Sequence, residues 1–142
     1  MNGARHAIEI QASADQVYDV IVDFASYPGF VPNQSATRVI SSDGDRWRVE
    51  FELSVVKKLH YTLDLTGVRA RTVEWTLVEG DMMKANTGRW LLEPLPDGRT
   101  RATYEISVEL RGFVPRSVSN ALIEKTLPAN LEAFKREAER RA

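Results

Sequence analysis

The chain has 142 residues, of which 43% are hydrophobic and 27% are charged, and these proportions are ordinary for a soluble globular protein. This length predicts one domain, residues 1–142, that buries about two-thirds of its unfolded surface. A formal net charge of -1 gives no electrostatic footprint for nucleic acid or an anionic membrane. The absence of cysteine excludes disulfides, thiolate nucleophiles and thiolate metal sites.

Targeting signals are not evident in the sequence. The first residues lack the apolar region of a signal peptide, and no apolar run approaches the roughly 18 residues that a membrane span needs. We therefore expect a cytoplasmic protein without a transmembrane segment, for which transient contact with a membrane surface stays open.

The first predicted elements are a strand and a helix. Residues 5–11 alternate between polar and apolar side chains and predict a strand. Ser13 with Gln16 three residues later forms a capping-box pattern that opens a helix. One apolar stripe follows at helical spacing: Val17, Val20, Ile21 and Phe24. Two prolines and a glycine within residues 27–32 then end this helix and predict a short helical turn whose aromatic side chains are buried.

Residues 36–110 form the predicted sheet region. One parity of each segment is large and apolar, and the other is polar or charged, which is the mark of an antiparallel sheet with one dry face. The apolar sets are Trp47, Val49, Phe51 and Leu53, then Tyr61, Leu63 and Leu65, then Val73, Trp75 and Leu77, and finally Tyr104, Ile106 and Val108. Turn signals at 42–45, 79–81 and 94–98 indicate a meander, with about seven strands in all.

A long C-terminal helix is predicted from about residue 115 to residue 141. Six residues fall on one face of it at spacings of three and four: Asn120, Ile123, Leu127, Leu131, Phe134 and Ala138. The resulting fold class is α+β, with a curved antiparallel sheet wrapped around this helix and two short helices after the first strand.

Several inward-pointing residues carry polar groups on an otherwise apolar face. Parity or helical phase places six of them inside: Tyr61, Trp75, Asn86, Trp90, Tyr104 and Asn120. They would either line a ligand cavity or fill a core with their polar tips bonded to backbone or water. As a ligand site they would be joined by Phe51, Ile123 and Leu127.

No catalytic or metal-binding group emerges. His60 shares its parity with exposed residues, and His6 lies at the start of an early strand where exposure is common. No cluster of histidines and carboxylates has metal-ligand spacing, and no phosphate loop or nucleophile elbow occurs. Five carboxylates are expected to face solvent: Glu50, Glu52, Asp64, Glu74 and Glu105. We therefore predict no catalytic residue, metal or cofactor.

Several segments resemble one protein superfamily. They are residues 12–20, the Tyr-Pro-Gly-Phe-Val-Pro of 27–32, Gly88-Arg89-Trp90-Leu91-Leu92-Glu93-Pro94, residues 98–104, and Phe113-Val114-Pro115. In these the chain resembles the START/birch-allergen-like (SRPBCC) superfamily with its helix-grip fold, and within it the polyketide cyclase/dehydrase and coenzyme Q-binding branch. The resemblance implies an apolar cavity between the sheet and the C-terminal helix, open at one end, but no single function.

Three functions follow as hypotheses. The first is binding of a hydrophobic small molecule: a lipid, an isoprenoid or quinone, or an aromatic polyketide-like compound. The second is a polyketide cyclase/dehydrase (aromatase-like) enzyme, which needs an acid or base aimed into the cavity. The third is a ribosome-association-toxin-like binder of a macromolecule, which the near-neutral charge does not support.

The expected cavity mouth comprises Phe30, Val31, Val114, Val118 and Leu122. Ligand identity and oligomeric state stay open.

Overall fold

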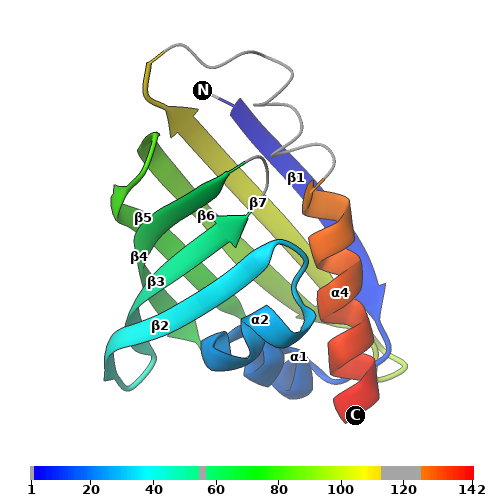
Figure 1. The fold of residues 1–142 in the computed structure, drawn as a ribbon. Coiled ribbons are helices and arrows are strands. Elements are labelled where there is room, and N and C mark those ends of the chain that lie inside the picture. Colours follow the sequence, from blue (N-terminus) through cyan, green and yellow to red (C-terminus); the bar gives the residue numbers. More distant parts are fainter. Residues whose placement is uncertain (1, 55–56, 113–125) are drawn as a thin grey trace.

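A computed structural model describes residues 2–54, 57–112 and 126–142. Seven antiparallel strands form one curved sheet in the order β1-β7-β6-β5-β4-β3-β2 (Figure 1). The strands are β1 (Asn2–Ile10), β2 (Gln34–Asp43), β3 (Arg46–Ser54), β4 (Lys58–Val68), β5 (Thr72–Gly80), β6 (Met83–Pro94) and β7 (Thr100–Leu110). The first strand begins three residues earlier than predicted, and the sheet region begins at residue 34 rather than 36.

The inner face of the sheet is dry, as the alternation predicts. In β3, Val49, Phe51 and Leu53 are buried, while the residues between them are partly exposed. β3 pairs with β4 in an antiparallel register that places Phe51 opposite Tyr61. The predicted meander is therefore confirmed, because residues of one parity meet across neighbouring strands on one face.

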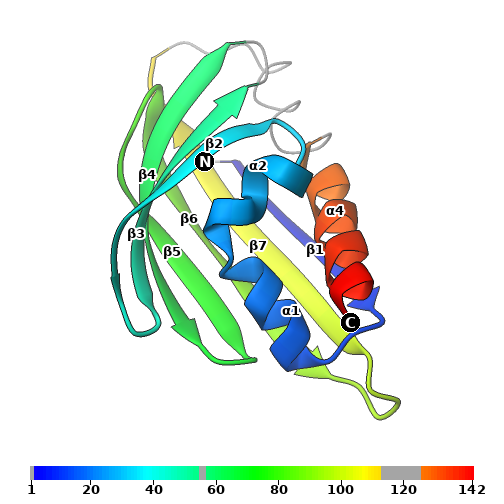
Figure 2. The same ribbon diagram turned by 60° about the horizontal axis from the view of Figure 1, so that its bottom comes forward.

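Two short helices and a 3-10 turn connect β1 to β2. Helix α1 (Ala14–Ile21) begins at the predicted capping box, in which the backbone N–H of Gln16 donates to the Ser13 hydroxyl and the Ser13 N–H donates to the Gln16 side chain. The 3-10 helix η1 (Phe24–Ser26) and the helix α2 (Tyr27–Phe30) follow. Figure 2 shows α1 and α2 beside the C-terminal helix on the concave side of the sheet.

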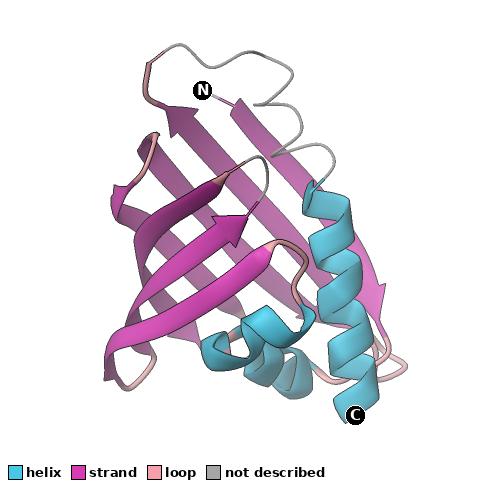
Figure 3. Ribbon diagram, viewed as in Figure 1, coloured by secondary structure: helices cyan, strands magenta, loops and turns pink. Residues whose placement is uncertain are grey.

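The C-terminal helix α4 (Thr126–Arg141) lies over the concave face of the sheet at its β1 end (Figure 3). Its buried side chains follow the predicted stripe: Leu127, Leu131, Phe134 and Ala138. The predicted start of this helix near residue 115 lies outside the described residues.

Polar bonds join α4 to the end of the edge strand β1. The Lys135 ammonium donates to the Glu9 carbonyl oxygen at 2.8 Å, and the Gln11 N–H donates to the Glu139 carboxylate at 2.8 Å. An edge strand has backbone groups that lack a neighbouring strand, and Lys135 bonds one such group, on Glu9, while Glu139 accepts from the chain just beyond the strand. They thereby hold the C-terminal half of α4 in place over the sheet.

Candidate functional site

The inner face of the sheet, the segment from α1 to α2, and α4 line a cavity of about 90 Å³. Aromatic rings from separate elements form about half of its wall. Phe51 of β3 stacks on Tyr61 of β4 with ring centroids 5.3 Å apart. On the other side, Trp90 of β6 meets Tyr104 of β7 at 4.9 Å and Phe134 of α4 at 5.1 Å. Tilted and stacked aromatic pairs of this kind contribute stabilisation beyond that from the apolar area they bury. These pairs therefore fix the shape of the wall.

Trp75 of β5 has its position fixed by two neighbours on β6. It lies opposite Gly88 in the β5–β6 register, and only a residue without a side chain leaves room for the indole ring there. The indole N–H donates to the Asn86 side-chain oxygen at 3.1 Å. Asn86 is buried, and this bond satisfies its oxygen inside the protein.

Two amides that the sequence analysis did not identify also line the cavity, Gln34 at the start of β2 and Asn130 on α4. The Gln34 amide nitrogen donates to the Tyr61 hydroxyl at 3.0 Å. For Asn130 a sequence signal existed, since it lies four residues before Phe134 on the apolar stripe. For Gln34 simple alternation gives no signal, because the register between β2 and β3 shifts between residues 34 and 36.

The described part of the cavity wall is uncharged at neutral pH. Within the described parts of the chain, no carboxyl, imidazole, ammonium or guanidinium group lines it. Burial raises the pKa of Tyr104 above its ordinary value. Burial also raises the pKa of Tyr61, which the hydrogen bond from Gln34 lowers in part. Both phenols are therefore neutral hydrogen-bonding groups and not bases.

Most of the residues predicted to bind a ligand share this wall, and their binding role stays a prediction. Those on the wall are Phe51, Tyr61, Trp75, Asn86, Trp90 and Tyr104. Leu127 is buried in the core and is not part of this wall. Asn120 and Ile123 lie outside the described residues.

The predicted mouth is described only in part. Val31 is buried and lines the cavity. Phe30 lies on the other side of the same wall, packed edge-on against Phe134 at 5.2 Å. There it borders an outer groove between α2 and α4, together with Pro32 and Ala133. The other predicted mouth residues, Val114, Val118 and Leu122, lie outside the described residues.

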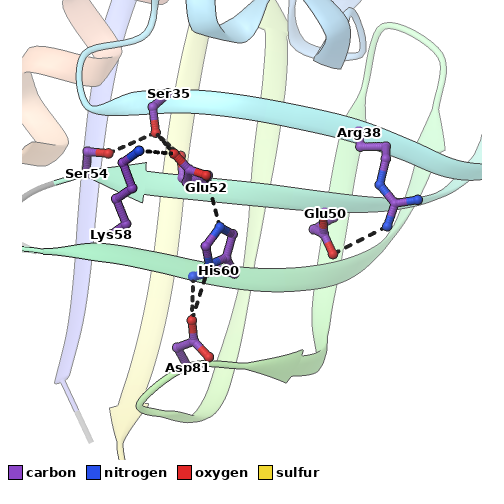
Figure 4. A network of polar contacts seen from close by, with 8 residues as sticks. All are labelled: Ser35, Arg38, Glu50, Glu52, Ser54, Lys58, His60 and Asp81. Atoms are coloured by element: carbon purple, nitrogen blue, oxygen red, sulfur yellow. Dashed lines mark hydrogen bonds and ion pairs between the residues drawn. The ribbon is translucent and has the colours of Figure 1, made fainter.

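His60 lies on the outer face, as its parity predicts. Figure 4 shows its exposed ring between two carboxylates, with Nε2 at 2.9 Å from Glu52 and Nδ1 at 3.5 Å from Asp81. The hydrogen bond with Glu52 is the main reason that the pKa of His60 is raised. His6 is also exposed, and none of the five carboxylates expected to face solvent is buried.

Neither a metal cluster nor a membrane-spanning helix is found in the described residues. No group of three or more His, Asp or Glu side chains in residues 2–54, 57–112 and 126–142 could hold a metal ion. No helix in these ranges combines the length and apolarity needed to cross a membrane.

Solved structures with the same fold cover nearly the whole chain. The Zhui aromatase/cyclase from Streptomyces sp. R1128 is 20% identical, with a TM-score of 0.89 over 99% of this chain and 94% of that one. A START superfamily protein from Mycobacterium smegmatis is 18% identical, with a TM-score of 0.87 over 99% of both chains. A STAR-related lipid transfer protein from Xanthomonas axonopodis is 19% identical, with a TM-score of 0.82 over 96% of this chain and 85% of that one.

At these identities the likeness to solved structures establishes the helix-grip fold and not an activity. Comparison with curated proteins gave no match. A family model, described as polyketide cyclase/dehydrase and lipid transport, matches residues 10–135. This match includes α1, α2, all strands from β2 to β7 and the part of α4 that lines the cavity. The chain therefore belongs to the polyketide cyclase/dehydrase and lipid transport family.

Proposed function

We propose that the protein binds a hydrophobic small molecule, of the lipid, isoprenoid or aromatic polyketide-like class, between the sheet and α4. The observation that carries this proposal is the aromatic wall with a few amide and phenol groups. Ligand sites are typically concave and mostly apolar, with a few polar groups that fix orientation. Burial of the ligand would drive binding, and the polar groups would orient it.

The cavity must expand to hold such a molecule. Its volume of about 90 Å³ is well below the roughly 300–1,000 Å³ of common ligand sites. The wall made by Tyr27, Phe30 and Phe134 separates it from the outer groove between α2 and α4. This wall joins helices and not hydrogen-bonded strands, so its displacement would leave the sheet intact. We propose it as the path by which a ligand enters.

An enzyme of the cyclase/dehydrase class is less well supported by the wall. Such an enzyme needs a group that accepts or donates a proton near neutral pH. The described wall offers phenols with raised pKa values and neutral amides. These groups can orient a ligand but are poor bases, so the proposal is for binding without proton abstraction by these residues.

Binding of a neutral fluorescent probe, N-phenyl-1-naphthylamine, tests the proposal. Ile106→Trp places a large ring in the cavity and should weaken binding roughly tenfold or more, because the space for an apolar ligand is lost. Ile40→Trp is the matched control, since Ile40 is 44% exposed on the edge strand β2. Fluorescence titration measures both dissociation constants. Equal binding by the two variants would place the probe elsewhere and contradict the proposal.

A further inference from the structure

Two residues that line the cavity each have a buried oxygen without a hydrogen-bond donor among the described residues. The two oxygens are Oε1 of Gln34 and Oδ1 of Asn130. A buried acceptor without a donor is unfavourable, and native proteins leave few of them. The two residues come from different elements, β2 and α4, and both line the same cavity.

The orientation of Gln34 is set by its neighbour. Its amide nitrogen donates to the Tyr61 hydroxyl at 3.0 Å, and the Tyr61 ring stacks on Phe51. With the nitrogen engaged in this way, the oxygen is left without a donor. The site therefore presents hydrogen-bond acceptors beside a flat aromatic surface.

The charge of the wall restricts what these acceptors can bind. A carboxylate ligand would bring a buried negative charge against carbonyl oxygens, with no cation in the described wall to pair with it. An uncharged hydroxyl group donates one hydrogen bond and needs no counter-charge. Because a hydroxyl also accepts, it would suit either orientation of an amide group.

We propose that the cavity selects uncharged alcohols or phenols whose hydroxyl donates to Gln34 Oε1 or Asn130 Oδ1, and disfavours the corresponding carboxylates. This inference rests on the proposed function, because it assigns the polar end of the same hydrophobic ligand. Aromatic burial would provide affinity, and the two amides would provide the selection.

Three ligands of one shape test the inference: 2-naphthol, naphthalene and 2-naphthoate, titrated by calorimetry at pH 7. We expect 2-naphthol to bind roughly tenfold more tightly than naphthalene, the gain from one added hydrogen bond, and 2-naphthoate to bind most weakly. Gln34→Leu and Asn130→Leu remove the acceptors one at a time. In at least one of these variants, 2-naphthol and naphthalene should bind with the same affinity. Gln11→Leu, an exposed position, is the control.

The outcomes separate this inference from the proposed function. Equal wild-type binding of 2-naphthol and naphthalene would mean that water alone satisfies the two oxygens, and would overturn the inference while hydrophobic binding stands. Tighter binding of 2-naphthoate would overturn it as well, as would binding of N-phenyl-1-naphthylamine with none of the three ligands. Failure of all four compounds to bind would overturn the proposed function, and the inference with it.

Discussion

The side chain of His60 on β4 lies between two carboxylates, one on a neighbouring strand and one in a turn. Its ring is exposed, and it bonds Glu52 of β3 and Asp81 in the turn after β5 (Figure 4). Ser35 and Lys58 also contact Glu52, so this carboxylate is the centre of the network. The arrangement stabilises the charged imidazolium and joins β3 to β4 on the outer face.

The raised pKa of His60 gives a testable pH dependence. The folded pKa lies above the unfolded value of about 6.5, so the stabilisation is fully present below pH 6.5 and is lost as pH rises through the folded pKa. NMR titration of the His60 ring should give a lower pKa in Glu52→Gln than in wild type. Glu74→Gln, which alters an exposed carboxylate on β5, should leave it unchanged. An unaltered His60 pKa in Glu52→Gln would show that the bond with Glu52 is not its cause.

At the scale of elements, the contact between β5 and β6 decides where Trp75 lies. A Cβ at position 88 would overlap the Trp75 ring and the backbone oxygen of Glu105 on β7. The ring could move, but the neighbouring strand cannot move without breaking its ladder. Gly88 thus allows β6 to lie between β5 and β7 with an indole packed over it.

We expect Gly88→Ala to destabilise the protein by about 1–3 kcal/mol, because it overpacks this contact. The displaced Trp75 should also lose its bond to Asn86 and change the near-ultraviolet circular dichroism. Gly29→Ala in α2 is the control, since a Cβ there meets nothing within 4 Å. Urea unfolding measures both variants. Equal stability of Gly88→Ala and wild type would mean that the sheet adapts without strain.

At the scale of the whole molecule, the pKa values of all the tyrosines are shifted in the same direction. The chain has 4 of them, and the pKa of each is raised, chiefly by burial. Burial, together with the bond to Asp45, raises the pKa of Tyr18 to about 12. Tyr27 is buried and donates its hydroxyl proton to the Ile21 carbonyl oxygen. The folded state therefore favours the neutral, protonated form of each phenol.

Alkaline titration should show this as a loss of stability. The folded pKa values exceed the unfolded value of about 10, so the stabilisation is present below pH 10 and is lost as pH rises through the folded values. Absorbance at 295 nm should show little tyrosinate near pH 10 until far-ultraviolet circular dichroism reports unfolding. In concentrated urea the tyrosines should ionise near pH 10. Ionisation of any tyrosine near pH 10 in the folded protein would contradict the prediction.

The fold could be predicted from the sequence because its signals are local and repeated. Alternation in β3 to β5 and β7, together with the capping box at Ser13, gives the elements and their dry faces. The same alternation places Phe51, Tyr61 and Trp75 inside. The alternation gives the wrong face for Gln34. This residue pairs with Leu53 beyond a register shift in β2, so its side chain is on the inner face although its even number matches the exposed residues of that strand.

The cavity volume could not be predicted by the same reasoning. Alternation predicts which side chains point inward but not the distances between them. Those distances depend on the curvature of the sheet and the position of α4. The stacking of Phe51 on Tyr61 and the contact of Phe134 with Trp90 narrow the space to about 90 Å³. Both contacts join residues from separate elements, so no local pattern records them.

The two amides with unpartnered oxygens come from elements outside the central strands of the sheet. Gln34 begins an edge strand, and Asn130 lies on the covering helix, whereas the aromatic wall comes largely from the central strands. On the proposal above, the groups that select a ligand are therefore separate from those that maintain the fold. On the same proposal, mutation at these two positions would exchange one ligand for another without rebuilding the core.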